Sequence, residues 1–518
     1  MVNLLIGIDV GTTGSKALLI NEEGNVIQSW TEEYPLYTPY PGWSEQDPED
    51  WWQATKKSIQ KILSLSAISP KDIKAIGLTG QMHGSVFLDS QGKVLRKAIL
   101  WNDQRTAKQC EEIIERVGGV KNLLNLTLNL ALTGFTAPKI LWLRENEPEI
   151  YSKVKKVLLP KDYIRYRLTG EYASEVSDAS GTLLFDVKNR KWSKEMLSLL
   201  DIPEDWMPKV YESPEITGTL LSDVAEELGL VPGIPVVGGG GDQAAQAVGT
   251  GIVKSGIVSV TLGTSGVVFA HLDKPEGEKE GRLHTFCHAV PGKWHTMGVM
   301  LSAGGSFRWF RDSFGEIEME LSKWTGKDPY EFLTMSAERV PSGAEGLLFL
   351  PYLTGERTPY PDPRAKGVFM GISLRHKKPY FVRSVLEGVA FGLKDSLELI
   401  KNLGIEIKEI RVSGGGARSP LWRQILADIF NNPIITINVT EGAAYGAALL
   451  AGVGVGIYKN VELACETAIK VVSKEEPKKE NVELYRELYE LYRSLYPLIK
   501  DYFGKLSSFV EKYYGNQK

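Results

Sequence analysis

Short apolar runs separated by polar, glycine-rich turns mark the start of the chain. Residues 4–8 predict a buried strand, and a turn rich in Gly and Thr leads into two further apolar runs joined by the polar segment 21–25. We therefore expect a β-meander. Residues 47–50, with the sequence Asp-Pro-Glu-Asp, supply an N-cap, a first-turn proline and early acidic residues, so a helix is predicted from there to residue 63.

The same pattern begins again near residue 250. An apolar run at 257–262, a polar turn at 263–266 and a second apolar run at 267–270 repeat in brief the strand, Gly/Thr turn and strand at 6–20. The repeat predicts two related α/β lobes. Further strands are expected at 73–78, 98–101, 235–237 and 410–413, and helices from about 242 and at 379–401, 421–430 and 442–451.

The end of the chain has a different pattern. From residue 477 to 513 Tyr, Leu, Lys and Glu recur at helical spacing. This predicts a terminal amphipathic helix that packs on the body of the protein through its aromatic side chains, with self-association as the less favoured use.

Length, composition and net charge indicate the domain organisation and the kind of partner. With 518 residues the chain is too long for one compact core, and it is expected to form two large domains or three smaller ones. Hydrophobic residues make up 43% and charged residues 24%, so the chain is expected to fold throughout. A formal net charge of -4 provides no basic field for a phosphate polymer, which argues against a nucleic-acid partner and favours a small molecule.

Cysteine usage and the absence of long apolar segments bear on location. The three cysteines are far apart and lack CxxC spacing, which indicates a reducing compartment and no disulfide framework. The first residues do not resemble a signal peptide, and the sequence contains no run of about 18 apolar residues that would form a membrane helix. A cytoplasmic location without membrane contact is therefore expected. The group His284, Cys287, His288 and His295 lacks the paired short intervals of a structural zinc site, and packing is favoured over metal binding there.

Asp9 lies at the end of the first predicted strand, where a buried carboxylate is costly unless it meets a cation. Gly11, Thr12 and Thr13 follow it and offer amide and hydroxyl donors to phosphate oxygens. The segment indicates a metal-phosphate site, and the alternative is a strand-to-strand turn capped by the aspartate. The second turn at 263–266 favours the first interpretation, because two such loops can hold one polyphosphate. The spacing fits neither a Walker-type loop nor a dinucleotide motif.

Asp242 follows four consecutive glycines and opens a predicted helix. An acid at such a place is often a plain N-cap. Four glycines cost chain entropy that a cap does not require, so close approach of another group to the backbone explains them better. A carboxylate held there can accept the proton of an attacking hydroxyl as a general base.

Two more glycine-rich segments follow predicted strands. His83 lies in the run Gly-Gln-Met-His-Gly at 80–84, which suits binding of polyol hydroxyls, although a lone histidine is more often structural. The segment 414–419 is able to admit a flat ring against bare backbone, with an ordinary tight strand-to-helix turn as the alternative.

With these residues the chain resembles the FGGY carbohydrate kinases from about residue 5 to 451. The resemblance is carried by ordered motifs at 9–13, 43–48, 80–84, 99–103, 134–139, 158–163, 239–242, 262–266, 355–359 and 414–419. The run Gln-Met-His at 81–83 is similar to members that phosphorylate D-xylulose, since members that act on glycerol carry Arg-Glu in place of Met82 and His83.

The resemblance implies an α/β fold of two ribonuclease H-like domains, of the actin and sugar kinase superfamily, around a central cleft. Residues 1–250 would form the N-terminal sugar-binding domain and residues 251–455 the C-terminal ATP-binding domain. Residues 456–518 would form a helical extension that packs on the body. The implied reaction is phosphorylation of D-xylulose by MgATP, which gives D-xylulose 5-phosphate, and a homodimer is a family-level expectation.

The resemblance also implies the roles of individual residues. Asp242 would be the catalytic base, and Asp9 would hold Mg²⁺ directly or through water. The ketose would be contacted by Met82, His83, Asp242 and Gln243. The phosphates and nucleoside of ATP would be held by Gly11, Thr12, Thr13, Lys16, Gly263, Thr264, Gly415 and Gly416.

One residue departs from the pattern. Gln243 stands where members that phosphorylate xylulose commonly have asparagine, and its longer amide reaches the sugar differently, so the sugar is less fixed than the reaction. The alternatives are a kinase for ribulose, gluconate, fuculose or glycerol, an actin-like or chaperone-like nucleotide switch, and a sugar sensor without catalysis. The switch leaves residues 81–83 unexplained, and retention of Asp9 and Asp242 argues against the sensor.

Overall fold

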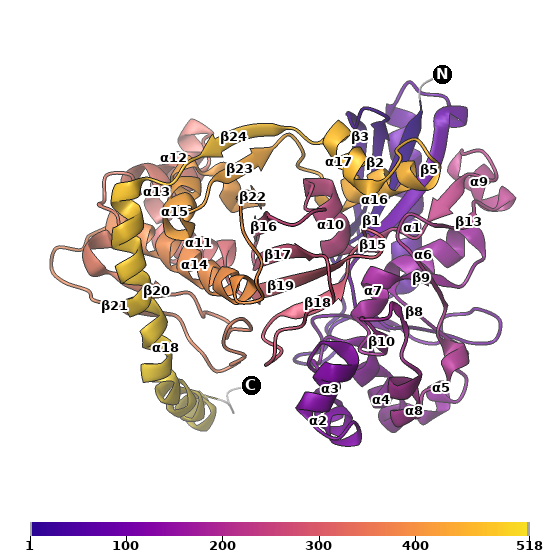
Figure 1. The fold of residues 1–518 in the computed structure, drawn as a ribbon, viewed down its shortest axis with the longest axis horizontal. Coiled ribbons are helices and arrows are strands. Elements are labelled where there is room, and N and C mark those ends of the chain that lie inside the picture. The colour runs from indigo at the N-terminus through magenta and orange to yellow at the C-terminus, as the bar shows by residue number, and fades with distance from the viewer. Residues whose placement is uncertain (1–2, 515–518) are drawn as a thin grey trace. The chain divides into compact units, whose positions relative to one another are not determined.

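The computed structural model describes residues 3–514, which form two compact units. The first contains residues 3–254, 271–296 and 441–470, and the second contains residues 255–270, 297–440 and 471–514. Each unit is built on a mixed β-sheet with helices (Figure 1), which confirms the predicted two-domain α/β class. The expected functional boundaries at 250/251 and 455/456 stay a prediction, because the units group residues by contact alone. In the part of the chain described, no helix has both the length and the apolar character needed to span a membrane.

The sheet of the first unit begins with the predicted meander. Strand β1 pairs antiparallel with β2, and β2 pairs antiparallel with β3, while β5 lies parallel to β1 on its other side. The sheet order is β13-β14-β5-β1-β2-β3, and the short β15 pairs with the end of β5. The bounds are β1 (Leu4–Val10), β2 (Gly14–Asn21), β3 (Val26–Glu33), β5 (Ile73–Gly80), β13 (Ile216–Thr219), β14 (Pro235–Val237) and β15 (Gly240–Gly241).

The sheet of the second unit repeats this arrangement. Strand β16 pairs antiparallel with β17 across a tight turn and parallel with β22, as β1 does with β2 and β5. The order in this unit is β19-β17-β16-β22-β23-β24. The predicted repeat is therefore confirmed at the level of topology. The bounds are β16 (Ile257–Leu262), β17 (Gly266–Leu272), β19 (Trp294–Met300), β22 (Glu409–Ser413), β23 (Ile434–Ile437) and β24 (Val471–Glu475).

Glycines let helix α16 (Gly442–Gly454) lie directly on the first sheet. A Cβ on Gly7 of β1 would come within 1.9 Å of the Ala444 carbonyl oxygen, and one on Gly77 of β5 would come equally close to that of Ala447. The helix α10 (Asp242–Thr250) approaches α16 in the same way, since a Cβ on Gly446 would lie 1.8 Å from the Ala245 oxygen. Only glycine permits such backbone contact. Residues late in the sequence thereby complete the first unit (Figure 1).

The remaining elements of the first unit surround this core. The predicted N-cap is confirmed, because the Asp47 carboxylate accepts a hydrogen bond from the Glu49 amide at the start of α1. The strand expected at 98–101 is shorter than predicted, because residues after Ile99 enter a turn. The other elements are α1 (Pro48–Leu65), α2 (Ala107–Arg116), α3 (Val120–Thr127), α4 (Thr136–Asn146), α5 (Pro148–Tyr151), α6 (Pro160–Thr169), α7 (Val176–Ser180), α8 (Lys194–Leu199), α9 (Ser222–Leu228), α17 (Val461–Ala468), β4 (Glu45–Gln46), β6 (Val86–Leu88), β7 (Ala98–Ile99), β8 (Lys156–Leu158), β9 (Ala173–Glu175), β10 (Phe185–Asp186), β11 (Lys191–Trp192), β12 (Lys209–Tyr211) and β18 (His284–Cys287).

In the second unit, the terminal helix α18 (Lys479–Tyr514) packs as predicted through its tyrosines, alongside α14 and α15 (Figure 1). The Tyr485 hydroxyl lies 3.0 Å from Arg383, and the Tyr489 hydroxyl donates to Asp395 at 2.6 Å, both on α14. The extension expected to be helical also contains strand β24, which pairs antiparallel with β23 at the sheet edge. The other elements of this unit are α11 (Gly304–Phe314), α12 (Glu316–Thr325), α13 (Pro329–Ala337), α14 (Lys378–Lys401), α15 (Pro420–Phe430), β20 (Leu348–Leu350) and β21 (Val368–Met370).

Candidate active site

Asp9 and the turn after it form one part of the candidate site. Asp9 is the penultimate residue of β1, and its Oδ1 is buried with no hydrogen-bond partner among the described residues. Burial raises the pKa of Asp9 to about 6, although the nearby positive charge of Lys16 acts in the opposite direction. A buried carboxylate oxygen that lacks a protein donor is suited to a cation.

Two glutamines hold the turn that follows Asp9. The Gln81 amide nitrogen donates to the Gly11 carbonyl at 3.2 Å, and the Gln46 amide nitrogen donates to the Thr12 carbonyl at 2.7 Å. The Thr12 hydroxyl also accepts a hydrogen bond from the Trp101 indole at 3.0 Å. Because the carbonyls are occupied, the loop conformation is fixed before any phosphate arrives.

Lys16 lies opposite Asp9 on the neighbouring strand β2. Its ammonium group forms an ion pair of 2.7 Å with Glu441, the N-cap residue of α16. Sequence reasoning selected Lys16 but missed Glu441, which is more than four hundred residues away in the chain. The pair holds the lysine beside the end of β1.

Asp242 is the first residue of α10, and the N-cap position belongs to Gly241. Its Oδ1 accepts a hydrogen bond of 2.7 Å from the amide of the next residue, Gln243, so it does not cap the helix in the usual way. Burial, with the negative charge of Asp9 as the second cause, raises the pKa of Asp242 to about 7. The negative charge of Asp9 therefore acts on Asp242 within the first unit.

The glycines before Asp242 are explained by packing. Gly239 has φ +70°, and a Cβ there would lie 1.7 Å from the Leu78 carbonyl oxygen of β5. The predicted close approach to this backbone exists, and the group that approaches is a strand of the sheet. Gly241 faces the Met82 sulfur, which a Cβ would meet at 3.0 Å. This contact brings Met82 beside the residue that precedes Asp242.

His83 is held in one orientation by its neighbours. Its Nδ1 lies 2.6 Å from the Gly181 carbonyl oxygen, and its ring stacks on Phe135 with centroids 4.6 Å apart. Because a carbonyl only accepts hydrogen bonds, Nδ1 carries a proton and donates it to this oxygen. The backbone of His83 has φ +69°, a conformation that L-residues rarely adopt outside constrained sites.

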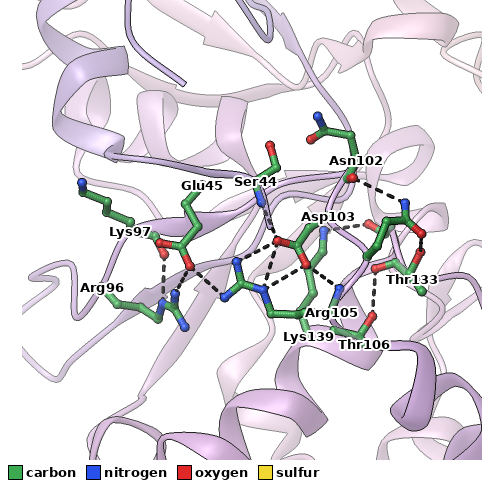
Figure 2. A network of polar contacts seen from close by, with 12 residues as sticks. Ser44, Glu45, Arg96, Lys97, Asn102, Asp103, Arg105, Thr106, Thr133 and Lys139 are labelled. Atoms are coloured by element: carbon green, nitrogen blue, oxygen red, sulfur yellow. Dashed lines mark hydrogen bonds and ion pairs between the residues drawn. The ribbon is translucent and has the colours of Figure 1, made fainter. Parts of the chain in front are cut away.

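A buried network of charged side chains joins two of the sequence motifs (Figure 2). The Arg105 guanidinium pairs with Asp103 at 2.7 Å and with Glu45 at 2.7 Å, and Glu45 also pairs with Arg96. The Asp103 carboxylate accepts a hydrogen bond of 2.7 Å from the amide of Ser44. The network thus joins the motif segments 43–48 and 99–103, to which the sequence assigned no separate role.

Lys139, from the motif at 134–139, contacts the backbone of His83. Its ammonium group donates to the carbonyl oxygens of His83 at 2.9 Å and Gly134 at 2.7 Å. Burial holds the pKa of Lys139 well below its usual range, with the Asp103 charge acting in the opposite direction. The strained backbone of His83 is therefore tied to a second motif by a side chain that solvent does not reach.

The second unit contains a cavity of about 690 Å³ that includes four predicted residues. Gly263 and Thr264 come from the turn between β16 and β17, and Gly415 and Gly416 come from the segment after β22. Apolar rings of Phe307, Tyr330 and Trp422 line the same cavity. A volume of this size with ring surfaces and a few polar groups fits a nucleotide-sized ligand.

Helix α11 shapes one wall of this cavity. The amide of Gly304 donates to the Gly263 carbonyl at 2.8 Å, and the amide of Gly305 donates to the Thr264 carbonyl at 3.0 Å. From the next turn of α11, the guanidinium of Arg308 lies 3.4 Å from the Thr264 hydroxyl. Sequence reasoning missed Arg308, although the glycine pair at 304–305 is the same kind of signal as the glycines in the segment 414–419.

The histidine cluster is packed in the first unit. The rings of His288 and His295 lie 5.7 Å apart, and His288 Nε2 lies 2.9 Å from the Ile252 carbonyl oxygen. Burial lowers the pKa of His295 to about 3 and that of His288 well below its usual value, so both rings are neutral. Within residues 3–514, no three His, Cys, Asp or Glu side chains are grouped so as to hold a metal ion.

Comparison with known families identifies the class of protein. The N-terminal domain of the FGGY family of carbohydrate kinases matches residues 4–249, and the C-terminal domain of the same family matches residues 258–455. The chain belongs to this family, and the protein is a carbohydrate kinase. Phosphorylation of a sugar with ATP as the donor, typically with Mg²⁺, is the activity of this class.

Three individual proteins show which carbohydrate kinases the chain is similar to. A xylulose kinase from Escherichia coli is 45% identical over 459 residues, which cover 88% of this chain and 91% of that protein. A crystal structure of a protein described as a xyloylose kinase from Brucella ovis matches with a TM-score of 0.88 and 38% identity, over 96% of this chain and 100% of that one. A gluconokinase from Bacillus licheniformis is 34% identical over 490 residues, 94% of both chains.

Proposed function

We propose that this carbohydrate kinase transfers the γ-phosphoryl group of ATP to D-xylulose and forms D-xylulose 5-phosphate, with Asp242 as general base. The observation that carries the proposal is the contact between Met82 and Gly241, which joins the Met82–His83 pair to Asp242 within one unit. Identity to xylulose kinases over most of the chain supports the same sugar.

The sugar is assigned to the groups around Met82. His83 contributes its imidazole ring to the contact with the sugar, and the orientation of the ring is fixed by Gly181. Met82, which is 5% exposed, contributes an apolar contact to a carbon of the ketose. Gln243, which follows the base, is partly exposed and supplies an amide that both donates and accepts.

Asp242 has the chemistry that a base for a sugar hydroxyl needs. A pKa of about 7 lies near the working pH, so the carboxylate is available to accept the hydroxyl proton as the bond to phosphorus forms. The leaving group is ADP, and the proton from the sugar hydroxyl resides on Asp242 until solvent removes it. The hydrogen bond from the Gln243 amide fixes one carboxylate oxygen.

The residues present fit a magnesium ion. Mg²⁺ is usually held by one or two carboxylates, waters and phosphate oxygens. The buried Oδ1 of Asp9 has no hydrogen-bond donor within residues 3–514. When bound, the ion would supply positive charge to the phosphates. Asp9 holds the ion directly or through water, and Lys16, fixed by Glu441, adds a second positive charge at the end of β1.

The phosphoryl donor is assigned to the two turns and the cavity. Gly263 and Thr264 offer backbone and hydroxyl groups to phosphate oxygens, while Gly415 and Gly416 face the nucleoside. Gly11, Thr12 and Thr13 provide the corresponding groups of the first unit, in a loop already held by Gln46 and Gln81. A cytoplasmic location and a homodimer remain expectations of the same proposal.

Gluconate is the second candidate substrate. A gluconokinase is among the relatives of high coverage, and Gln243 departs from the residue expected for xylulose. A carboxylate-bearing substrate calls for a cation near Met82 and His83, and the ammonium of Lys139 is buried and committed to two carbonyls. Because Lys139 already donates to these carbonyls, the site favours a neutral ketose over gluconate.

The test is ADP release from MgATP with D-xylulose, D-ribulose, L-ribulose, L-xylulose, D-gluconate and glycerol, each against a control without sugar. We expect the highest kcat/KM with D-xylulose. A preference for another sugar would keep the kinase and reject the substrate, and no stimulation by any sugar would reject both. Asp242→Asn is expected to abolish turnover while ATP binding, measured by calorimetry, stays within about twofold; a substantial residual rate would reject the base.

A further inference from the structure

The short helix α7 (Val176–Ser180) lies between the two parts of the sugar site. All five of its residues are buried. Its start is capped by the Glu175 carboxylate, which accepts hydrogen bonds from the amides of Ser177 at 2.6 Å and Asp178 at 2.8 Å. The first turn of α7 is therefore fixed by its own cap, and its side chains are available for other contacts.

The first end of α7 contacts the segment of the base. The Ser177 hydroxyl accepts a hydrogen bond of 3.0 Å from the amide of Gly241 and donates one of 2.9 Å to Glu175. Gly241 is the N-cap residue of α10, and the next residue is Asp242. The link from Glu175 through Ser177 to Gly241 thus fixes the peptide from which the base projects.

The other end of α7 contacts the sugar-binding histidine. Gly181 follows the last residue of the helix, and its carbonyl oxygen accepts the hydrogen bond from His83 Nδ1 at 2.6 Å. A Cβ on Gly181 would lie 2.5 Å from the His83 ring and 2.9 Å from the Met82 methyl group. The side chains of Met82 and His83 rest directly on this glycine.

A buried group of charges holds α7 and the glycine segment together. The Arg165 guanidinium donates to the carbonyls of Val237 at 2.6 Å and Gly238 at 2.7 Å. Lys161 pairs with Asp178 on α7 at 3.0 Å and lies 3.5 Å from Glu175. These side chains are fully buried, so water does not compete for the contacts among them.

From these contacts we infer that α7 positions both halves of the sugar site, with Ser177 as a positioning residue for Asp242 and Gly181 as a positioning residue for His83. The inference rests on the proposed function, since it assumes Asp242 as the base. Neither residue touches the reacting atoms. Their effect is exerted through the Gly241 amide and the His83 ring.

The chain offers a matched control for Ser177. Ser180 lies on the same helix, is equally buried, and accepts a hydrogen bond of 3.0 Å from the Cys287 amide on β18. Ser177→Ala and Ser180→Ala therefore remove the same group from the same helix, and each leaves one buried amide without its partner. Only the first change reaches the segment of Asp242.

We expect Ser177→Ala to lower kcat by roughly tenfold to a hundredfold, because small displacements of a reacting group have effects of this size. The KM for ATP is expected to stay within about twofold, as a change confined to the base leaves nucleotide binding alone. Ser180→Ala is expected to keep kcat within about threefold of wild type at a similar loss of melting temperature. Equal kcat values for the two variants would overturn the role of Ser177.

Gly181→Ala tests the other end of the helix. The added methyl group is expected to displace the His83 ring and raise the KM for the sugar by roughly tenfold, with a smaller effect on kcat. An unchanged sugar KM would overturn this half of the inference. If Ser177→Ala does not fold, Ser177→Cys, which fills the same space with a weak acceptor, replaces it under the same criteria.

Asp242→Asn, assayed in parallel, distinguishes a failure of the proposed base from a failure of the positioning role of Ser177. An active Asp242→Asn enzyme means that the proposed base is wrong. An inactive one, together with equal activities of the two serine variants, means that the base is retained and only the positioning role is wrong.

Discussion

The two hairpins β1–β2 and β16–β17 share a topology and differ in chemistry. In the first hairpin, the second residue pair from the turn is Asp9 and Lys16. In the second hairpin, the corresponding pair is Thr261 and Val267. Each hairpin has a parallel neighbour, which places Thr79 beside Asp9 and Ser413 beside Thr261. The repeat thus preserves the strand pairing around the turn, while the aspartate and lysine pair occurs in one copy alone.

The largest effect is expected from neutralising the charge that distinguishes the first hairpin. Asp9→Asn is expected to lower kcat by at least about 100-fold, because it removes the only carboxylate of the turn. Thr261→Val, at the corresponding register of the second hairpin, is expected to change kcat less than about fivefold. Steady-state assays with saturating sugar and ATP compare the two. Similar losses for both variants would mean that the hairpins contribute alike.

A smaller and more selective effect is expected in the second unit. A Cβ on Gly416 would lie 2.8 Å from the Trp422 ring, so Gly416→Ala crowds the wall of the cavity. Overpacking of this kind costs about 1–3 kcal/mol, which predicts a rise of roughly tenfold in the KM for ATP. The sugar KM is expected to stay unchanged. A change in sugar KM alone would contradict the assignment of the cavity to the nucleotide.

The smallest effect is expected on the pH dependence of stability, and it arises from the buried carboxyl group of Asp178 on α7. Burial raises the pKa of Asp178 to about 8, so the folded protein keeps a proton that the unfolded chain releases near its ordinary pKa of 3.8. The folded state then binds more protons between these values, and stability falls as the pH rises through this range. Wild type is expected to lose about 2–4 °C more in melting temperature between pH 6 and 8 than Asp178→Asn. Parallel pH dependences of the two proteins would show that Asp178 is ionised in the folded state.

Local patterns in the sequence predicted most of the fold. The alternation of apolar runs and glycine turns placed both hairpins, and the Asp-Pro start placed α1 at the correct residue. The glycine segments also predicted where the backbone approaches another group closely, as Gly239 approaches the Leu78 carbonyl oxygen, while the roles of these loops in a site stay a prediction. The terminal helix was predicted from the helical spacing of Tyr, Leu, Lys and Glu, and its tyrosines between residues 485 and 496 are buried as expected.

The contacts that orient the site were not predictable in this way. Residues 173–182 are small and polar, with no apolar period, and nothing in them indicates that Ser177 meets Gly241. Glu441 acquires its role only because α16 returns to the first sheet, where it meets Lys16. Such positions depend on tertiary packing, which sequence periodicity does not record.

The return of α16 to the first sheet also bears on the order of folding during synthesis. The ribosome releases the chain from its N-terminus, and domains generally fold as units once their residues have emerged. Strands β1 and β5 present bare glycine backbone to a helix that is made about four hundred residues later. The nascent first unit therefore keeps this sheet face uncovered until residues 442–454 have been translated, and that face is the surface a chaperone would have to protect.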